Sequence, residues 1–383
     1  MDSMAAGRRL GGGIILAWAL LAWAAIALVA GLLPDSPGLL HSAPWEVWPL
    51  DPAIAVPLVL CAAVYLRGAR SAPAPSAGRQ AAFLGAIAAL TLALQSPIFS
   101  MASRSFALDA VGQMLLRTVA PALLAMAAPM EALRRGVRAG NAQVAGAQAP
   151  PSGALWAARR GAHRALRALA DGLSRPLPAT ALYVGTAYVW AWPAARDGAL
   201  LDPWMRGAMD LSFVLSGLAF FRALFDLRAE PAGPTIGTRL LMVWGAELGN
   251  ILLGYFLTYT SLPLYRAYAA HGLLWGLTPL ANQMYGGQTL WLCDTAMIGV
   301  AAMVVIFRWA REEDRLRGPR LHPGTDRAAW LARQRASNRR VVLGLLGFVA
   351  MIVGIMGASV VLYEVTYHRA VAHAPAVSVN QIP

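Results

Sequence analysis

The stretch that decides the fold is "FALDAVGQMLLRTVAP", residues 106–121. It is apolar enough to cross a lipid bilayer as a helix, yet it carries Asp109, Gln113 and Arg117. These side chains recur every fourth position, so they share roughly one face of an α-helix. Ionisable residues inside a membrane are costly and usually face a partner or a polar cavity. The stretch therefore predicts a membrane helix whose polar face meets other polar groups.

The composition is that of a polytopic membrane protein and excludes an ordinary soluble domain. Of the 383 residues, 58% are hydrophobic and only 13% are charged. The net charge of +13 comes from 32 basic residues, all of them Arg. Their concentration in alternate loops explains this charge without a nucleic-acid partner, and we expect none.

Nine apolar segments reach or approach the length that crosses a ~30 Å hydrocarbon layer, about 20 residues. The segments cover approximately 11–33, 51–66, 80–98, 105–129, 178–195, 207–226, 240–260, 287–307 and 341–363. The expected fold class is therefore all-α: a polytopic integral membrane bundle of about nine transmembrane helices.

The density of Arg alternates between successive loops. Residues 130–177 hold eight Arg, and ten more lie from Arg308 to Arg340. The alternate loops hold only Arg104, Arg196, Arg206, Arg266 and Arg369. By the positive-inside rule, the N-terminus is cytoplasmic and the C-terminus periplasmic, as expected for a multi-pass protein of a bacterial inner membrane.

Three regions follow from this topology. Residues 1–50 are expected to form a transmembrane helix, or an uncleaved signal anchor, with an outer loop. Residues 51–315 form a core of seven membrane helices. Residues 316–383 comprise a basic cytoplasmic loop, an extra C-terminal transmembrane helix and an outer tail. Within the loop 130–177, "ALWAARRGAHRALRALADGL" has the pattern of a basic amphipathic helix that lies on anionic lipid.

Polar residues on several predicted helices converge on the outer half of the membrane. They are Asp109, Gln113, Arg206, Asp210, Asn282 and Asp294. Two interpretations stay open: a polar pocket that opens to the periplasm, or pairwise contacts that hold helices together. Nearer mid-membrane, Arg117 needs a counter-charge, and we expect an ion pair with Glu247 on the seventh segment.

The predicted positions of the His residues do not favour a cofactor site inside the membrane. The six His residues lie in predicted loops or at a helix end. A membrane-embedded haem is commonly held by His residues on facing helices, and a copper site in the bilayer also favours imidazole. The sequence therefore predicts neither.

Several motifs, in order, resemble the CtaG family of cytochrome c oxidase assembly factors. They are "DPAIAVPLVLCAAVYLRGAR" (51–70), "MDLSFVLSGLAFF" (209–221), "FLTYTSLPLYRAYA" (256–269), "LTPLANQMYGGQTLW" (277–291) and "RWAREEDR" (308–315). The resemblance covers about 51–315 and leaves the first and last predicted helices outside it.

The resemblance implies His residues that this chain lacks. Aligned on Phe106 and Leu115, two family His residues fall on Asp109 and Gln113, and a His-rich stretch falls on Arg206 and Asp210. A further His, expected after the fifth segment, is missing from "VWAWPAARDGAL". The chain is thus similar to a divergent member of the family.

The family resemblance implies copper as the metal that those histidines could bind. Imidazoles four residues apart on a helix suit it, whereas carboxylate and amide groups are poorer ligands for Cu(I). Metal handling is therefore doubtful here. The remaining weak ligand candidates are Asp109 with the thioethers of Met114 and Met209.

The resemblance implies an assembly or accessory factor for a copper-containing cytochrome c oxidase, acting from the periplasmic face. Its partners would be terminal oxidase subunits, other assembly factors and membrane lipids. No P-loop, nucleophile elbow or HExxH motif is present, so we do not expect an enzyme. Two alternatives remain: a transporter for protons or metal cations that uses the buried carboxylates, and a metal-free structural subunit.

Overall fold

The computed structural model describes residues 51–144, 171–226, 228 and 233–317. The predicted membrane segments 11–33 and 341–363 lie outside these residues, as does most of the predicted amphipathic helix that begins at 154. The regions 1–50 and 318–383 also lie outside them, together with every His except His271.

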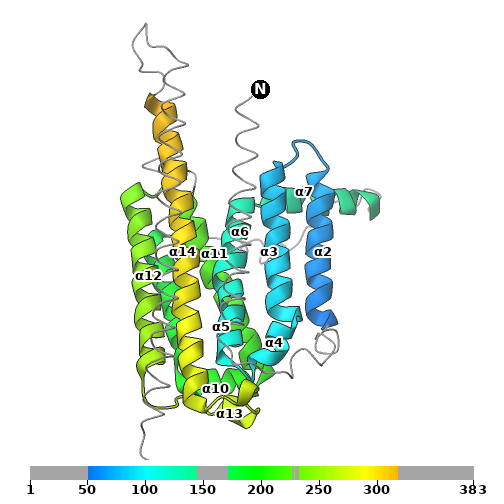
Figure 1. The fold of residues 1–383 in the computed structure, drawn as a ribbon. Helices are drawn as coiled ribbons and strands as arrows, with labels where there is room; N and C mark the ends of the chain where they lie inside the picture. The colour runs from blue at the N-terminus through cyan, green and yellow to red at the C-terminus, as the bar shows by residue number, and fades with distance from the viewer. Residues whose placement is uncertain (1–50, 145–170, 227, 229–232, 318–383) are drawn as a thin grey trace, which may run out of the picture. The chain divides into compact units, whose positions relative to one another are not determined.

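All regular secondary structure in the described ranges is helical (Figure 1). In chain order the helices are α2 Pro52–Ala69, α3 Ala77–Gln95, α4 Pro97–Ala102, α5 Phe106–Met114, the π-helical turn η1 Leu115–Val119, α6 Ala120–Ala127, α7 Met130–Val144, α9 Pro176–Ala191, α10 Pro193–Leu201, α11 Pro203–Leu224, α12 Ile236–Tyr259, α13 Ala267–Ala270, the 3-10 turn η2 Leu274–Gly276 and α14 Pro279–Arg317.

Among the described residues, six helices are long and apolar enough to cross a membrane. They are α2, α3, the continuous helix Phe106–Ala127, α11, α12 and α14 as far as Arg311. The all-helical membrane architecture predicted from the sequence is therefore confirmed for the described core. The segment predicted at 178–195 forms α9, which has only 16 residues and is followed by Pro193 at the start of α10. The total of nine spans and the orientation stay predictions.

The central element is the helix Phe106–Ala127, made of α5, η1 and α6. Ser105 caps its start by accepting a hydrogen bond from the Leu108 amide, and Ala128 ends it in the left-handed conformation at φ 45°. In its membrane window 83% of the residues are buried. Since α3 and α11 pack along α6 and η1, this helix is enclosed by protein and its polar side chains face other helices.

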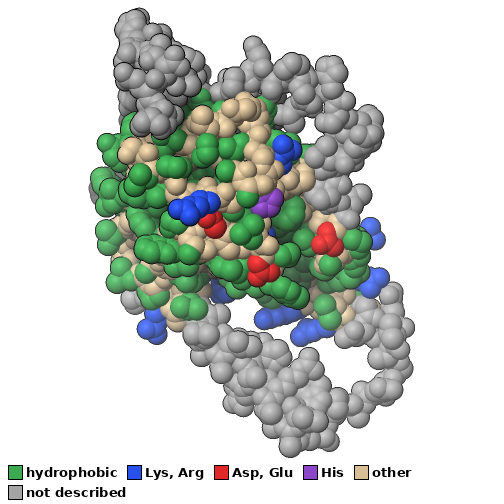
Figure 2. All heavy atoms as spheres, turned by 90° about the horizontal axis from the view of Figure 1, so that it is seen from below, with side chains coloured by type: hydrophobic (Ala, Val, Ile, Leu, Met, Phe, Trp, Pro, Cys, Tyr) green, Lys and Arg blue, Asp and Glu red, His purple; other side chains and the backbone are tan. Residues whose placement is uncertain are grey.

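The short helices α10 and α13 lie together at one end of the bundle, and α7 lies at the other end (Figure 1). We call the first the α10–α13 end. Asp197 fixes α13 there by accepting hydrogen bonds from the amides of Arg266 and Ala267, both at 3.2 Å. Tyr265 donates to the Ala191 carbonyl at 2.8 Å. Seen from this end, the described surface is largely hydrophobic or uncharged, with a few separate charged side chains (Figure 2).

Close packing of α11 on the central helix depends on a glycine. A Cβ atom at Gly217 would lie 2.0 Å from the Arg117 carbonyl oxygen and 2.8 Å from the Pro121 ring. Both neighbours belong to the central helix and cannot rotate away. By contrast, a Cβ at Gly207, on the same helix, would meet nothing within 4 Å.

We expect Gly217→Ala to lower the free energy of unfolding by about 1–3 kcal/mol, because overpacking forces two helices apart. Gly207→Ala is the matched control and should be neutral or slightly stabilising, since Ala favours the helix. Thermal unfolding of both variants in detergent measures the difference. Equal melting temperatures would contradict this packing.

Candidate functional site

Six polar side chains form a buried group near the α10–α13 end, which we call the Asp109 cluster. Its members are Asp109, Gln113, Arg196, Arg206, Asp210 and Tyr268. They come from four helices, α5, α10, α11 and α13. Asp109 and Arg196, at its centre, are 0% and 1% exposed. The cluster therefore joins helices that are far apart in the sequence.

The Asp109 carboxylate is the hub of this cluster. Its Oδ2 atom lies 2.5 Å from Nη1 of Arg196, and it accepts hydrogen bonds from Gln113 Nε2 at 2.8 Å and from the Tyr268 hydroxyl at 2.9 Å. Its Oδ1 atom lies 2.8 Å from Nη1 of Arg206. Both carboxylate oxygens are thus engaged, and three of the four donor groups come from outside α5.

The outer members complete the network. Arg196 also donates from Nη2 to Gln113 Oε1 at 3.3 Å, so both ends of the Gln113 amide are used. Arg206 Nε lies 3.4 Å from Asp210 Oδ2, one helical turn along α11. Two arginines and two aspartates cancel in charge, which suits a buried site.

Aromatic rings and a phenol stabilise the charges further. The Arg196 guanidinium lies 5.0 Å from the Phe106 ring centroid and 5.8 Å from that of Tyr265, within cation–π range. Burial raises the pKa of the Tyr268 phenol well above its usual value, and the Asp109 carboxylate raises it further. Tyr268 therefore stays protonated and serves as a hydrogen-bond donor to Asp109.

The sequence predicted four of these six residues as neighbours but missed Arg196 and Tyr268. The topology predicts Arg196 in a loop on the Arg-poor side. The small number of Arg residues on that side could have indicated a buried role for Arg196, since an Arg there does not help to set the orientation of the chain. The structure buries it because α10, which begins at Pro193, packs against α9, α11 and α13. Tyr268 carried no comparable signal in the sequence.

A second buried group lies further along the central helix, and we call it the Arg117 cluster. Its members are Arg117, Thr118, Tyr183, Asn250 and Asp294. Arg117 forms an ion pair with Asp294 and donates to Asn250 Oδ1 at 2.8 Å. Thr118 donates to Asp294 Oδ1 at 2.7 Å, and its hydroxyl lies 2.8 Å from that of Tyr183. This cluster joins the central helix to α9, α12 and α14.

The structure corrects two predictions. Arg117 pairs with Asp294 on α14, not with Glu247, because Asp294 faces the central helix at that level while Glu247 forms no ion pair among the described residues. Asp294 accordingly belongs to the Arg117 cluster and not to the group around Asp109. Arg117 does not share the partners of Asp109 and Gln113, since the π-helical turn η1 begins between them and changes the helical register.

Asn282 also has a different role from the predicted one. Its Oδ1 atom accepts a hydrogen bond from the Phe106 amide at 3.0 Å, at the first residue of α5. That amide has no partner within its own helix. Asn282 therefore caps the central helix from α14 and does not join the Asp109 cluster.

The residues near Asp109 do not fit copper. Both of its oxygens already contact guanidinium or hydrogen-bond donors, and a metal cation there would face two arginines. Met114 and Met209 are buried on α5 and α11, 4% and 0% exposed. In the described part of the chain, no three His, Cys, Asp or Glu side chains are grouped so that they could hold a metal ion.

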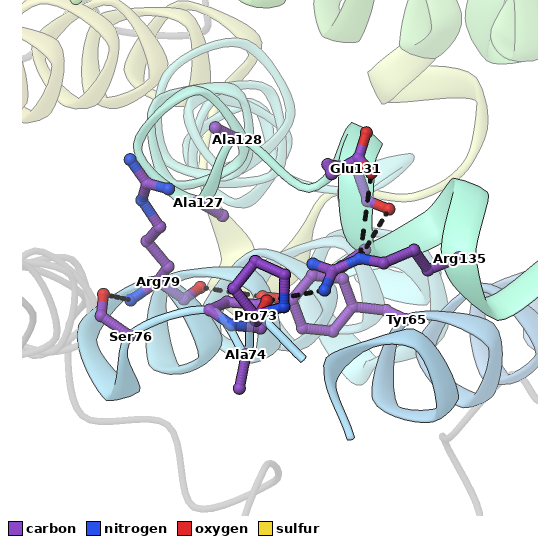
Figure 3. Close-up of a pocket in the computed structure, with 11 residues that line it drawn as sticks. Tyr65, Pro73, Ala74, Ser76, Arg79, Ala127, Ala128, Glu131 and Arg135 are labelled. Carbon is purple, nitrogen blue, oxygen red and sulfur yellow. Dashed lines mark hydrogen bonds and ion pairs between the residues drawn. The ribbon is translucent and has the colours of Figure 1, made fainter. Parts of the chain in front are cut away.

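A cavity of about 480 Å³ lies at the α7 end, between α2, α3 and α7 (Figure 3). Arg135 projects across it and donates to the carbonyls of Ser71 at 3.0 Å and Pro73 at 2.6 Å. Glu131 lies 4.0 Å from Arg135, and the Tyr65 ring stacks on Phe83. Because Arg135 and Tyr65 already serve packing contacts, we assign the cavity a structural role.

Comparison with known proteins gives a family match and distant relatives. Residues 59–312 match the cytochrome c oxidase caa3 assembly factor family. An uncharacterized protein of Mycobacterium leprae is 24% identical over 290 residues, which are 74% of this chain and 42% of the relative. One from Mycobacterium bovis is 24% identical over 335 residues, 81% of this chain and 49% of the relative. The chain spans less than half the length of these relatives, and no solved structure matches it.

We expect Asp109→Asn to destabilise the protein by about 3–5 kcal/mol, because it leaves two buried guanidinium groups without their carboxylate. Asp171→Asn is the control, since Asp171 and Arg222 are both exposed and 4.0 Å apart. An exposed pair contributes at most about 1 kcal/mol. Denaturant unfolding in mixed micelles measures both. Similar losses for the two variants would contradict the buried network.

The corrected partner of Arg117 can be tested in the same assay. Asp294→Asn should cost about 3–5 kcal/mol, since Arg117 would lose its only counter-charge among the described residues. Glu247→Gln should change the unfolding free energy by less than about 1 kcal/mol, because no ion pair is lost. A larger loss of unfolding free energy in Glu247→Gln than in Asp294→Asn would instead identify Glu247 as the partner of Arg117.

Proposed function

Because the chain belongs to the cytochrome c oxidase caa3 assembly factor family, we propose that it assists assembly of a copper-containing cytochrome c oxidase without binding copper itself. It acts by contact with oxidase subunits or other assembly factors at the periplasmic face of a bacterial inner membrane. It carries out no catalytic step of its own.

The observation that carries this proposal is the composition of the Asp109 cluster. Asp109, Gln113, Arg206 and Asp210 stand at positions where the family resemblance implies histidines. In this chain those positions converge on one site and form a charge-balanced network with Arg196 and Tyr268. Such a network joins four helices, which supports a rigid surface and not a metal-transfer site.

The distribution of Arg supports the periplasmic side for this surface. The α7 end carries Arg134, Arg135 and Arg138, and the loop that follows α7 carries five more Arg up to Arg175. By the positive-inside rule that end faces the cytoplasm. The Asp109 cluster, near the opposite end, then lies close to the periplasmic surface, the side on which we propose that contact with the oxidase takes place.

Deletion of the gene tests the proposal. We expect the amount of assembled oxidase, measured from its haem absorption and its copper content in isolated membranes, to fall several-fold and to recover with the wild-type gene. Asp171→Asn should complement fully, whereas Asp109→Asn should not, because it opens the network.

Unchanged oxidase after deletion would contradict an assembly role. Stoichiometric recovery of the chain with the mature, active oxidase would instead identify it as a structural subunit. Both outcomes are read from the same membrane preparations, by quantitative immunoblotting of the chain and of one oxidase subunit.

A further inference from the structure

Glu247 is the acidic residue of the membrane core that neither cluster uses. It lies near the middle of α12, three residues before Asn250. Both of its carboxyl oxygens are buried, and neither makes a hydrogen bond to any group in the described ranges. Arg117, which the sequence predicts as the ion-pair partner of Glu247, pairs with Asp294 instead.

The groups around Glu247 do not supply a counter-charge. The Thr295 hydroxyl on α14 lies beside the carboxyl, and it too is without a hydrogen bond among the residues described. Asp294, from the same helix, adds a negative charge nearby, which is neutralised by Arg117 from the central helix. Tyr183 from α9 faces that pair. No cation in the described structure remains for Glu247.

The same seam holds further unpartnered polar atoms. Asn250 Nδ2 on α12 and Trp291 Nε1 on α14 are buried and lack acceptors within the described residues. The two helices touch here, since a Cβ at Gly254 would lie 2.4 Å from the Trp291 Cβ. The seam between α12 and α14 is thus a polar strip with no fixed charge except the Arg117–Asp294 pair.

Glu247 also stands beside the lipid-facing surface of α12. Its neighbours Trp244 and Leu248 are 72% and 53% exposed and would face acyl chains in a membrane. An isolated carboxylate in such surroundings has neither water nor a cation to stabilise it, whereas the neutral acid needs neither. The uncharged surroundings of Glu247 therefore favour the neutral, protonated carboxylic acid over the carboxylate.

We propose that Glu247 is a proton-binding site of this protein, a carboxylic acid held neutral in the seam between α12 and α14, beside the lipid-facing surface of α12. Its acidic proton is directed to the polar atoms of that seam, with Thr295 as its first contact. The site is independent of copper and of the Asp109 cluster, so it goes beyond the proposed assembly function.

A lipophilic carbodiimide tests this proposal. Such a reagent reacts with a protonated carboxyl: the acid proton moves to a carbodiimide nitrogen, a carboxylate oxygen adds to the central carbon, and the adduct rearranges to a stable N-acylurea without another reactant. We expect dicyclohexylcarbodiimide to modify Glu247 in the full-length protein in lipid nanodiscs at neutral pH. Peptide mass spectrometry locates the added mass, and Asp109 and Asp294 should stay unmodified because they are ion-paired.

Two controls sharpen the result. Glu247→Gln, which keeps the shape of the side chain, should abolish the modification, and Asp226→Asn, outside the membrane helices, should leave it unchanged. A water-soluble carbodiimide with an added amine should modify the exposed carboxyls of Glu131 and Asp171, 69% and 74% exposed, but not Glu247. Modification of Glu247 by the water-soluble reagent would overturn the proposal, because it would show a hydrated group.

Infrared spectroscopy gives a second readout that needs no reagent access. A protonated carboxylic acid has a C=O band distinct from that of a carboxylate, and this band shifts in heavy water. We expect the wild-type spectrum to contain such a band that Glu247→Gln removes. If the two spectra coincide in that region, Glu247 is ionised and the proposal is wrong, whatever the reagent shows.

Discussion

Lipid hydrocarbon does not solvate charge, so a charged side chain at membrane depth must find its counter-charge within the protein. This constraint organises the core of the structure. The central helix Phe106–Ala127 carries Asp109 and Arg117, and each recruits partners of opposite charge from other helices. The resulting clusters connect the central helix to α9, α10, α11, α12, α13 and α14. Charge pairing thus connects these helices to the central helix, while α3 packs along α6 and η1 without an ion pair.

The same constraint explains why the positions at which the family resemblance implies histidines differ here as a set. A carboxylate at Asp109 alone would be an uncompensated buried charge, and so would a guanidinium at Arg196 or Arg206. Together they form a neutral network with every oxygen of Asp109 engaged. A neutral ion-pair network of this kind is consistent with the proposed assembly factor, which works through contacts between proteins.

Much of the fold was predictable, because its signals are local. Apolar length identified the six membrane helices of the described residues, and spacing of four residues placed Asp109 and Gln113 on one helix face, where they form a hydrogen bond. The remaining contacts depend on tertiary structure. Arg196 reaches Asp109 because α10 packs against α11 and α13, and depth alone did not distinguish Glu247 from Asp294 as the partner of Arg117. The π-helical turn, which separates Arg117 from Asp109, has no sequence signature that we recognised.

The central claim is that an ion-pair network occupies the place of a metal site, and copper content tests it most directly. The detergent-purified protein is loaded with Cu(I), desalted and analysed for metal beside the Asp109→Ala/Gln113→Ala double variant. We expect both proteins to retain far less than one copper per chain, at the same level. One stoichiometric copper in the wild type that the double variant loses would contradict the account.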